Sequence, residues 1–183
     1  METEGLFSRI LVPTDFSRGS ERAWSIAQRV AKNLGAELVL LHVLPVSPLD
    51  EDKVLREEER KAELRSLQAD HQLGIPRAVE DTAPRANFEG PLSDDFSVAG
   101  RAWAAELETW ADAARANGCK VRTVLRVGVP YREVIMLAGE EAVDLVLMAT
   151  HGRGEIQRLL LGSVADKVVR MAPCPVLTVK QAA

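Results

Sequence analysis

The chain has 183 residues, and its 23 lysines and arginines against 27 aspartates and glutamates give a net charge of −4. This length predicts one domain, and a hydrophobic fraction of 46% is too high for a disordered chain. The sequence contains no apolar run long enough to span a bilayer and no N-terminal signal pattern. The acidic balance argues against a nucleic-acid partner. Cys119 and Cys174 form no CxxC pair, which argues against a disulfide scaffold or zinc site and favours the cytoplasm.

Five short segments are expected to form β-strands. Four of them are unbroken apolar runs, which are typical of strands buried on both faces of a parallel sheet, at 9–13, 37–44, 143–149 and 175–180. Segment 121–127 instead alternates apolar residues with Arg122 and Arg126, a pattern that favours an edge strand. The last strand, PVLTVK, is a second plausible edge.

Helical patterns stand between these strands. Apolar residues recur at helical spacing in four segments, which we place at 23–34, 103–114, 134–138 and 156–168. Trp24, Trp103 and Trp110 fall on these apolar faces and are predicted to be packing residues. Strands that alternate with helices predict an α/β fold with an open, doubly wound parallel sheet.

The middle of the chain interrupts this alternation. Residues 50–70 contain eight acidic and five basic residues, which favour an exposed helix or a charged linker rather than a partner-binding helix. Residues 74–100 contain six glycines and prolines and predict a structureless connection, either an insertion or a mobile flap. A solvated loop without a specific role is the simpler interpretation of that connection.

A ligand-binding site is expected beyond the carboxyl ends of the strands, where ligands of open α/β sheets bind. Gly152 is followed after nine residues by Gly162 and Ser163, which precede a strong helical segment at 163–171. If a helix begins there, its free N–H groups favour a phosphate, and Arg153 supplies charge. The alternative is a turn glycine with an ordinary N-cap serine. From residue 150 onward the chain has five basic and two acidic residues, a local charge of +3.

The residues of this region resemble a known family. The segment HGRGEIQRLLLGSVADKVVRMAPCPVLTVK is similar to the C-terminal half of the universal stress protein family, whose nucleotide-binding members carry Gly-x-x-Gly, nine residues, then Gly-Ser or Gly-Thr. The segments ILVPTDFS, LVLLHV and VLRVGVPYREVI also resemble that family, in the same order. The resemblance implies a Rossmann-like, adenine nucleotide α-hydrolase-like sheet of strand order 3-2-1-4-5. It implies one domain over 1–183 with an insertion at about 45–100.

The resemblance also implies a nucleotide site over the first and fourth strands. Asp15 would hold the ribose, and Pro13, Thr14 and Val43 would contact the adenine and ribose, with Met148 lining the cleft. The phosphates would lie in a loop that includes His151 and against Gly152, Arg153, Gly162, Ser163 and Val164. Ala149 replaces the first glycine of the motif. Its methyl group is harmless if the local φ is negative and the Cβ points away from the phosphates.

The expected function is regulatory binding of ATP or a related adenine nucleotide, with slow or no hydrolysis and no catalytic residue. Mg²⁺ or Mn²⁺ would bind through the phosphates without a protein cage, because Mg²⁺ usually keeps several of its waters. His42, His71 and His151 show no metal-ligand spacing. The resemblance implies a homodimer paired through the last strand, without a nucleic-acid or membrane partner. Two alternatives stay open: a dimeric interaction module that binds no nucleotide, and a nucleotide hydrolase or transferase.

Overall fold

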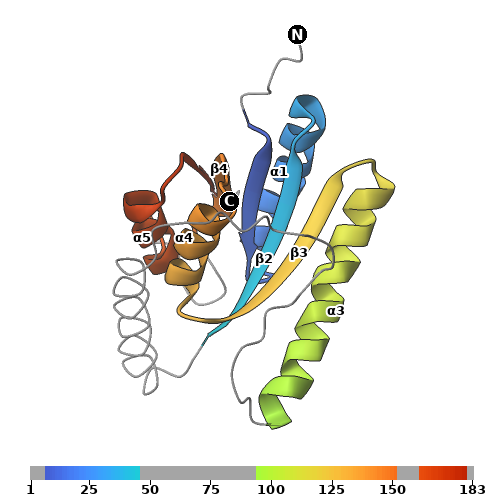
Figure 1. Ribbon diagram of the computed structural model, residues 1–183, viewed down its shortest axis with the longest axis vertical. Helices are drawn as coiled ribbons and strands as arrows, with labels where there is room; N and C mark the ends of the chain where they lie inside the picture. Colours follow the sequence, from blue (N-terminus) through green and yellow to red (C-terminus); the bar gives the residue numbers. More distant parts are fainter. Residues whose placement is uncertain (1–6, 46–93, 152–160, 181–183) are drawn as a thin grey trace, which may run out of the picture.

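The sheet has five parallel strands in the order β3-β2-β1-β4-β5, in a computed structural model that describes residues 7–45, 94–151 and 161–180. The strands are Arg9–Thr14 (β1), Glu37–Pro45 (β2), Lys120–Gly128 (β3), Leu145–Ala149 (β4) and Val176–Val179 (β5). The helices are Arg18–Leu34 (α1), Asp94–Ala116 (α3), Pro130–Glu140 (α4) and Ser163–Met171 (α5). This strand order confirms the predicted α/β fold, including β3 and β5 as the two edges (Figure 1).

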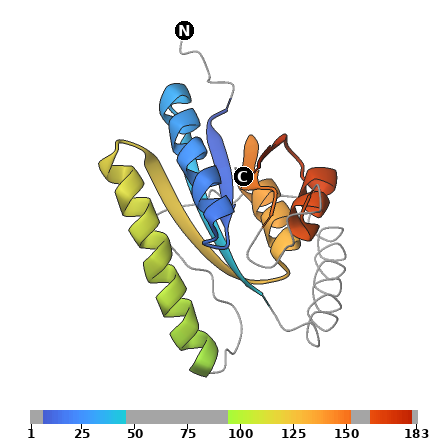
Figure 2. The ribbon, with the colours of Figure 1, turned by 180° about the vertical axis from the view of Figure 1, so that it is seen from behind.

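Two helical layers cover the two faces of the sheet. Residues of α1 and α3 pack with Ile10, Val12, Leu38 and Leu40 on one face. Residues of α4 and α5 pack with Leu11, Val39, Leu41 and Val146 on the other. Seen from behind, α1 lies in front of the strands and α3 lies beside β3 (Figure 2). Each central strand therefore presents alternate residues to two separate cores, which explains its unbroken apolar sequence. None of the helices described here is long and apolar enough to cross a membrane.

Several elements begin or end at other residues than the sequence predicted; α1, for example, begins at Arg18 rather than at residue 23. Strand β4 begins at Leu145 rather than at residue 143, because the Asp144 carboxylate accepts hydrogen bonds from the backbone N–H groups of Ser8 and Arg9 at 2.7 and 2.8 Å. The structureless connection predicted for 74–100 is wrong from Asp94 onward, where α3 begins. Gly100, which suggested a loop, lies inside that helix. A single helical glycine costs about 1 kcal/mol relative to alanine, and the helix-forming residues after it offset this cost. The charged segment at 50–70 and the rest of the connection lie outside the described residues.

The parallel arrangement gathers the carboxyl ends of the central strands at one end of the sheet. Pro13 and Thr14 of β1 pair with Leu41 and His42 of β2. On the other side, β1 pairs with β4, whose Ala149 pairs with Val179 of β5. Asp144 lies at the opposite end of β4, before the strand begins. The topology therefore brings residues 13–15, 42–45 and 148–151 to the same end of the sheet, at the carboxyl ends of the strands.

Candidate pocket at the carboxyl end of the sheet

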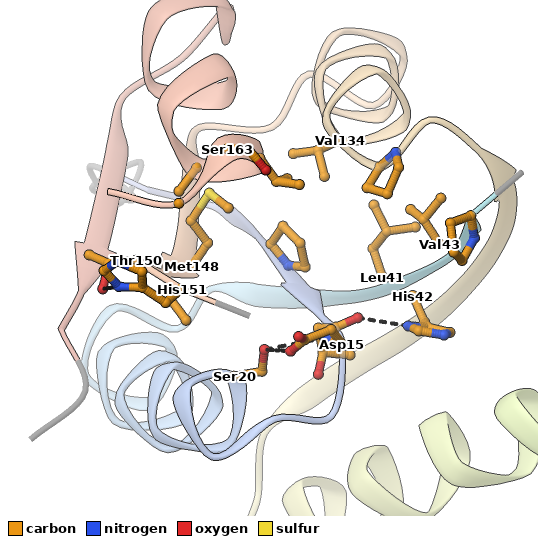
Figure 3. A pocket seen from close by; sticks show the side chains of 18 of the residues that line it. Asp15, Ser20, Leu41, His42, Val43, Val134, Met148, Thr150, His151 and Ser163 are labelled. Carbon is orange, nitrogen blue, oxygen red and sulfur yellow. Dashed lines mark hydrogen bonds between the residues drawn. The ribbon is translucent and has the colours of Figure 1, made fainter. Parts of the chain in front are cut away.

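A cavity of about 600 Å³ lies at this end of the sheet. Its apolar wall comes from strands β1, β2 and β4 and helices α4 and α5, and includes Pro13, Leu41, Val43, Val134 and Met148. Its polar groups include Asp15, Ser20, Thr150, His151 and Ser163 (Figure 3). An apolar cavity of this size with a few convergent polar groups is typical of a site for a small molecule.

The site residues predicted from the sequence come together at this cavity wherever the structure describes them. Ten of them line it: Pro13, Thr14, Asp15, Val43, Met148, Ala149, His151, Gly162, Ser163 and Val164. Gly152 and Arg153 lie outside the described residues. The role of each residue in binding stays a prediction.

Asp15 is held in a small hydrogen-bond network where the chain leaves β1 and enters α1. Its Oδ1 accepts the backbone N–H of Ser17 at 3.1 Å and the hydroxyl of Ser20. Ser17 is the N-cap of α1, and its hydroxyl accepts the backbone N–H of Ser20 at 3.2 Å. The helix cap and the carboxylate therefore share Ser17 and Ser20, so the start of α1 orients Asp15.

His42 lies beside this network at the carboxyl end of β2. It is buried, and its Nδ1 lies 2.7 Å from the backbone oxygen of Thr14. Since a carbonyl oxygen only accepts, Nδ1 is the nitrogen that carries a proton. His42 is therefore held by a hydrogen bond across the ends of β1 and β2.

The N-terminus of α5 forms the other side of the cavity. Gly162 is the N-cap and Ser163 the first helical residue, and no side chain caps this end. The alternative of an N-cap serine is therefore wrong, because Ser163 stands one position too late. The Gly162 N–H donates to the backbone oxygen of Thr150 at 2.7 Å, and the Thr150 N–H donates to Val179. These two bonds fix the start of α5 against the ends of β4 and β5.

Ala149 presents its methyl group to the opposite face from Met148. The alternation along β4 places Met148 in the core under α4 and α5, and Ala149 in the core under α1. Ala149 is not among the described residues with positive φ. A Cβ built on Gly19 of α1 would lie 3.3 Å from the Ala149 Cβ and 3.0 Å from the His151 backbone oxygen. The methyl group thus occupies space that Gly19 leaves open, and the condition on φ is met. That the Cβ points away from the phosphates stays a prediction.

Sequence reasoning missed the contribution of α3 to the cavity. Trp103, expected only to pack, lines it together with Asp15 and His42. The ring of Phe16 stacks on Trp103 at a centroid distance of 5.2 Å and lies 4.8 Å from the His42 ring. Helical periodicity showed that Trp103 lies on an apolar face, but it carries no information on which strand end that face meets.

Other reactive residues lie elsewhere. Cys119 and Cys174 are free thiols, and burial raises the pKa of the Cys174 thiol, which makes it a poorer nucleophile. Neither cysteine lines the cavity. Within residues 7–45, 94–151 and 161–180, no three His, Cys, Asp or Glu side chains gather in a way that could hold a metal ion.

The sequence model of the Universal stress protein family matches residues 6–180. The chain belongs to this family. It is 29% identical to universal stress protein MJ0577 of Methanocaldococcus jannaschii over 176 residues, 96% of each chain. It is 30% identical to universal stress protein MJ0531 of the same organism, over 97% of this chain and 85% of that protein.

Solved structures of universal stress proteins share the fold. The structure of MJ0577 has a TM-score of 0.63 at 25% identity, covering 97% of this chain and 98% of that one. A universal stress protein in complex with cAMP has a TM-score of 0.61 at 22% identity, covering 97% and 99%. One from Archaeoglobus fulgidus in complex with dAMP has a TM-score of 0.56 at 19% identity, covering 94% and 98%. Some structural relatives of this universal stress protein therefore bind adenine nucleotides.

Proposed function

We propose that this universal stress protein binds ATP or a related adenine nucleotide in the cavity at the carboxyl end of the sheet. The observation that supports this best is the meeting of three features in one cavity. These are the carboxylate of Asp15, the apolar wall around Val43 and Met148, and the N-terminus of α5. A nucleotide needs all three, because it combines a hydroxylated sugar, a flat base of low polarity and an anionic phosphate chain.

The base and ribose fit the part of the cavity beside β1 and β2. Val43 and Met148 offer apolar contacts to the base, together with the backbone at Pro13 and Thr14. The Asp15 carboxylate accepts hydrogen bonds from the ribose hydroxyls in this proposal. Figure 3 shows Asp15 and Ser163 on opposite sides of the cavity, which leaves the space between them for the sugar and phosphates.

The phosphates are assigned to the N-terminus of α5. The Gly162 N–H is bonded to the Thr150 oxygen, so the backbone N–H groups proposed to meet the phosphates are those of Ser163 and Val164, at the positive end of the helix dipole, which favours an anion. Gly152 and Arg153 are predicted to complete the phosphate site, and His151 lies at its edge. Mg²⁺ or Mn²⁺ would be held through the phosphates and water, because Mg²⁺ needs few protein ligands when a phosphate chain is present.

The role of this site is proposed to be regulatory. Asp15 is assigned to the ribose, so it is not available as a general base, and we assign no catalytic residue. Slow or no hydrolysis would let the bound nucleotide persist and bias a dimer or a partner surface.

Native mass spectrometry of the freshly purified protein tests the proposal. We expect a bound species with the mass of an adenine nucleotide, and saturable binding of ATP with Mg²⁺ in calorimetry. Titrations with ADP, AMP and cAMP then rank the ligands. The absence of saturable binding at millimolar ATP would overturn the proposal and favour an interaction module that binds no nucleotide.

An Ala149→Gly variant tests whether the replaced motif glycine matters. Because the methyl group packs toward Gly19, we expect ATP affinity to change by less than about threefold, below 1 kcal/mol. Thermal unfolding should show a loss of roughly 0.5–1 kcal/mol, since glycine gains chain entropy in the unfolded state. A tenfold gain in affinity would contradict this prediction and show that the methyl group crowds the ligand.

A homodimer through β5 is the second part of the proposal. This strand is an edge of the sheet, and Leu177 on it is 44% exposed. Val169 and Met171 of the neighbouring helix α5 are also exposed apolar residues. An open edge with apolar side chains beside it is unfavourable in water, and pairing with a second copy would cover both.

A further inference from the structure

Phe16 has an unfavourable backbone conformation next to Asp15. Its φ is +60°, and the only other non-glycine residue with positive φ in the described part of the chain is Ala142, in the turn before β4. The left-handed region is rare for a bulky side chain, and such residues persist only where the surrounding structure holds them. Something at the carboxyl end of β1 must therefore stabilise Phe16 in this conformation.

Aromatic rings surround the Phe16 side chain. Trp103 stacks on it with an interplanar angle of 14°, and the His42 ring lies 4.8 Å away on the β2 side. The His42 and Trp103 rings are 5.0 Å apart, so the three rings form a closed triangle. Trp110, two turns further along α3, meets Phe16 edge-on at 5.2 Å. We attribute the direction of the Phe16 side chain, and with it the backbone at residue 16, to the two contacts within the triangle.

The conformation at Phe16 determines where the Asp15 carboxylate lies. The Phe16 N–H donates to the Thr14 hydroxyl at 3.0 Å, and the next N–H, of Ser17, donates to Asp15 Oδ1 at 3.1 Å. The turn that Phe16 makes is thus the turn that directs Ser17 back toward Asp15. Two of the three rings, His42 and Trp103, also line the cavity that Asp15 faces.

We infer that Phe16 and Trp103 are positioning residues for the ligand, which hold the Asp15 carboxylate in its binding orientation. Helix α3 is then part of the binding site through Trp103, although none of the predicted ligand contacts comes from it. The inference rests on the proposed function for the identity of the ligand. Its structural part, the ordering of Asp15 by the ring triangle, does not depend on any ligand.

Trp110 offers a matched control for Trp103. Both tryptophans come from α3 and both contact Phe16, but Trp110 does not line the cavity and is not part of the ring triangle. A loss of affinity caused only by weaker packing of α3 would be similar in the Trp103→Ala and Trp110→Ala variants. A loss caused by the ring triangle would be confined to Trp103→Ala.

Calorimetric titration with ATP and Mg²⁺ compares these variants. We expect Trp103→Ala to weaken binding about tenfold, Trp103→Phe to stay within about threefold of the wild type, and Trp110→Ala to lose less than about threefold. When Asp15 is already replaced by Asn, Trp103→Ala should change affinity by less than about twofold, because both substitutions remove the same interaction. Equal losses in the two backgrounds, or in the two tryptophan variants, would overturn the inference.

Hydrogen exchange of the ligand-free protein separates this inference from the proposed function. In Trp103→Ala, the amides of residues 14–20 should exchange at least about tenfold faster, while those of α5 stay unchanged. Unchanged exchange at 14–20 would overturn the inference whether or not nucleotide binds. If the wild-type protein bound no nucleotide, the proposed function would fall, and faster exchange would still support the ring triangle as the element that orders Asp15.

Discussion

An Asp15→Asn variant is expected to bind ATP ten to a hundred times more weakly than the wild-type protein. Hydrogen bonds to a charged group contribute about 1.5–3 kcal/mol, and each 1.4 kcal/mol is a factor of ten in affinity. The substitution keeps the size of the side chain and leaves an oxygen for the hydrogen bonds from Ser17 and Ser20. The loss should therefore reflect the ligand rather than the fold. Calorimetric titration with ATP and Mg²⁺ measures it.

The same substitution at Asp144 is the control. That carboxylate accepts two backbone N–H groups at the opposite end of the sheet, away from the cavity. Asp144→Asn should lower the melting temperature because the Oδ2 that accepts both N–H groups loses its charge, and it should leave ATP affinity unchanged. If Asp15→Asn bound ATP as well as the wild type, the assignment of Asp15 to the ribose would be wrong. Equal losses in both variants would point to a general effect on folding.

A Leu177→Lys variant is expected to convert a dimer into a monomer at micromolar concentration. Leu177 is exposed on the β5 edge, and a second copy paired there would bury it. A lysine would place an unpaired charge in the interface, and burying such a charge costs several kcal/mol. The dissociation constant of the dimer should rise by at least about a hundredfold, or roughly 2.7 kcal/mol. Size-exclusion chromatography with light scattering measures the shift.

Leu34→Lys provides a matched control for this change. Leu34 is 39% exposed, close to the 44% of Leu177, but it lies at the C-terminal end of helix α1 rather than on the edge strand β5. The Leu34 variant should keep the oligomeric state of the wild type. A wild-type protein that runs as a clean monomer at micromolar concentration would refute the dimer proposal, and dissociation in both variants would refute its placement on β5.

The sheet could be predicted from the sequence because each strand is a short apolar run between helical patterns. The apolar runs predict the strand ends to within two residues. The largest difference is at the start of β4, which was predicted two residues too early because Asp144 binds the N–H groups of Ser8 and Arg9. The start of α3 could not be predicted, since the apolar periodicity begins only at Trp103 and Gly100 suggested a break. Helical periodicity detects only the part of a helix that has an apolar face. A helix can extend beyond that part, and the extension leaves no periodic signal.

The residues of the candidate site could be identified from the motif and from the strand ends. The residues that hold them in place could not. The positive φ of Phe16 has no sequence signal, because that conformation is associated with glycine and asparagine and here depends on rings from β2 and α3. Trp103 could be assigned to a helix face but not to the cavity. The direction of the Ala149 methyl group depends on strand alternation and on Gly19, which only the packed structure brings together.

The contact between Gly19 and Ala149 makes the space between α1 and β4 a shared volume. With the Ala149 methyl group on the strand side, a Cβ at position 19 would crowd it at 3.3 Å and would also meet the His151 backbone oxygen at 3.0 Å, so both methyl groups fit only if their neighbours shift. Position 149, where alanine replaces the motif glycine, is therefore coupled to position 19 of α1. Whether an alanine there signals a lost nucleotide site depends on the residue that α1 places opposite it, so the motif is better judged from two positions far apart in the chain than from the glycine spacing alone.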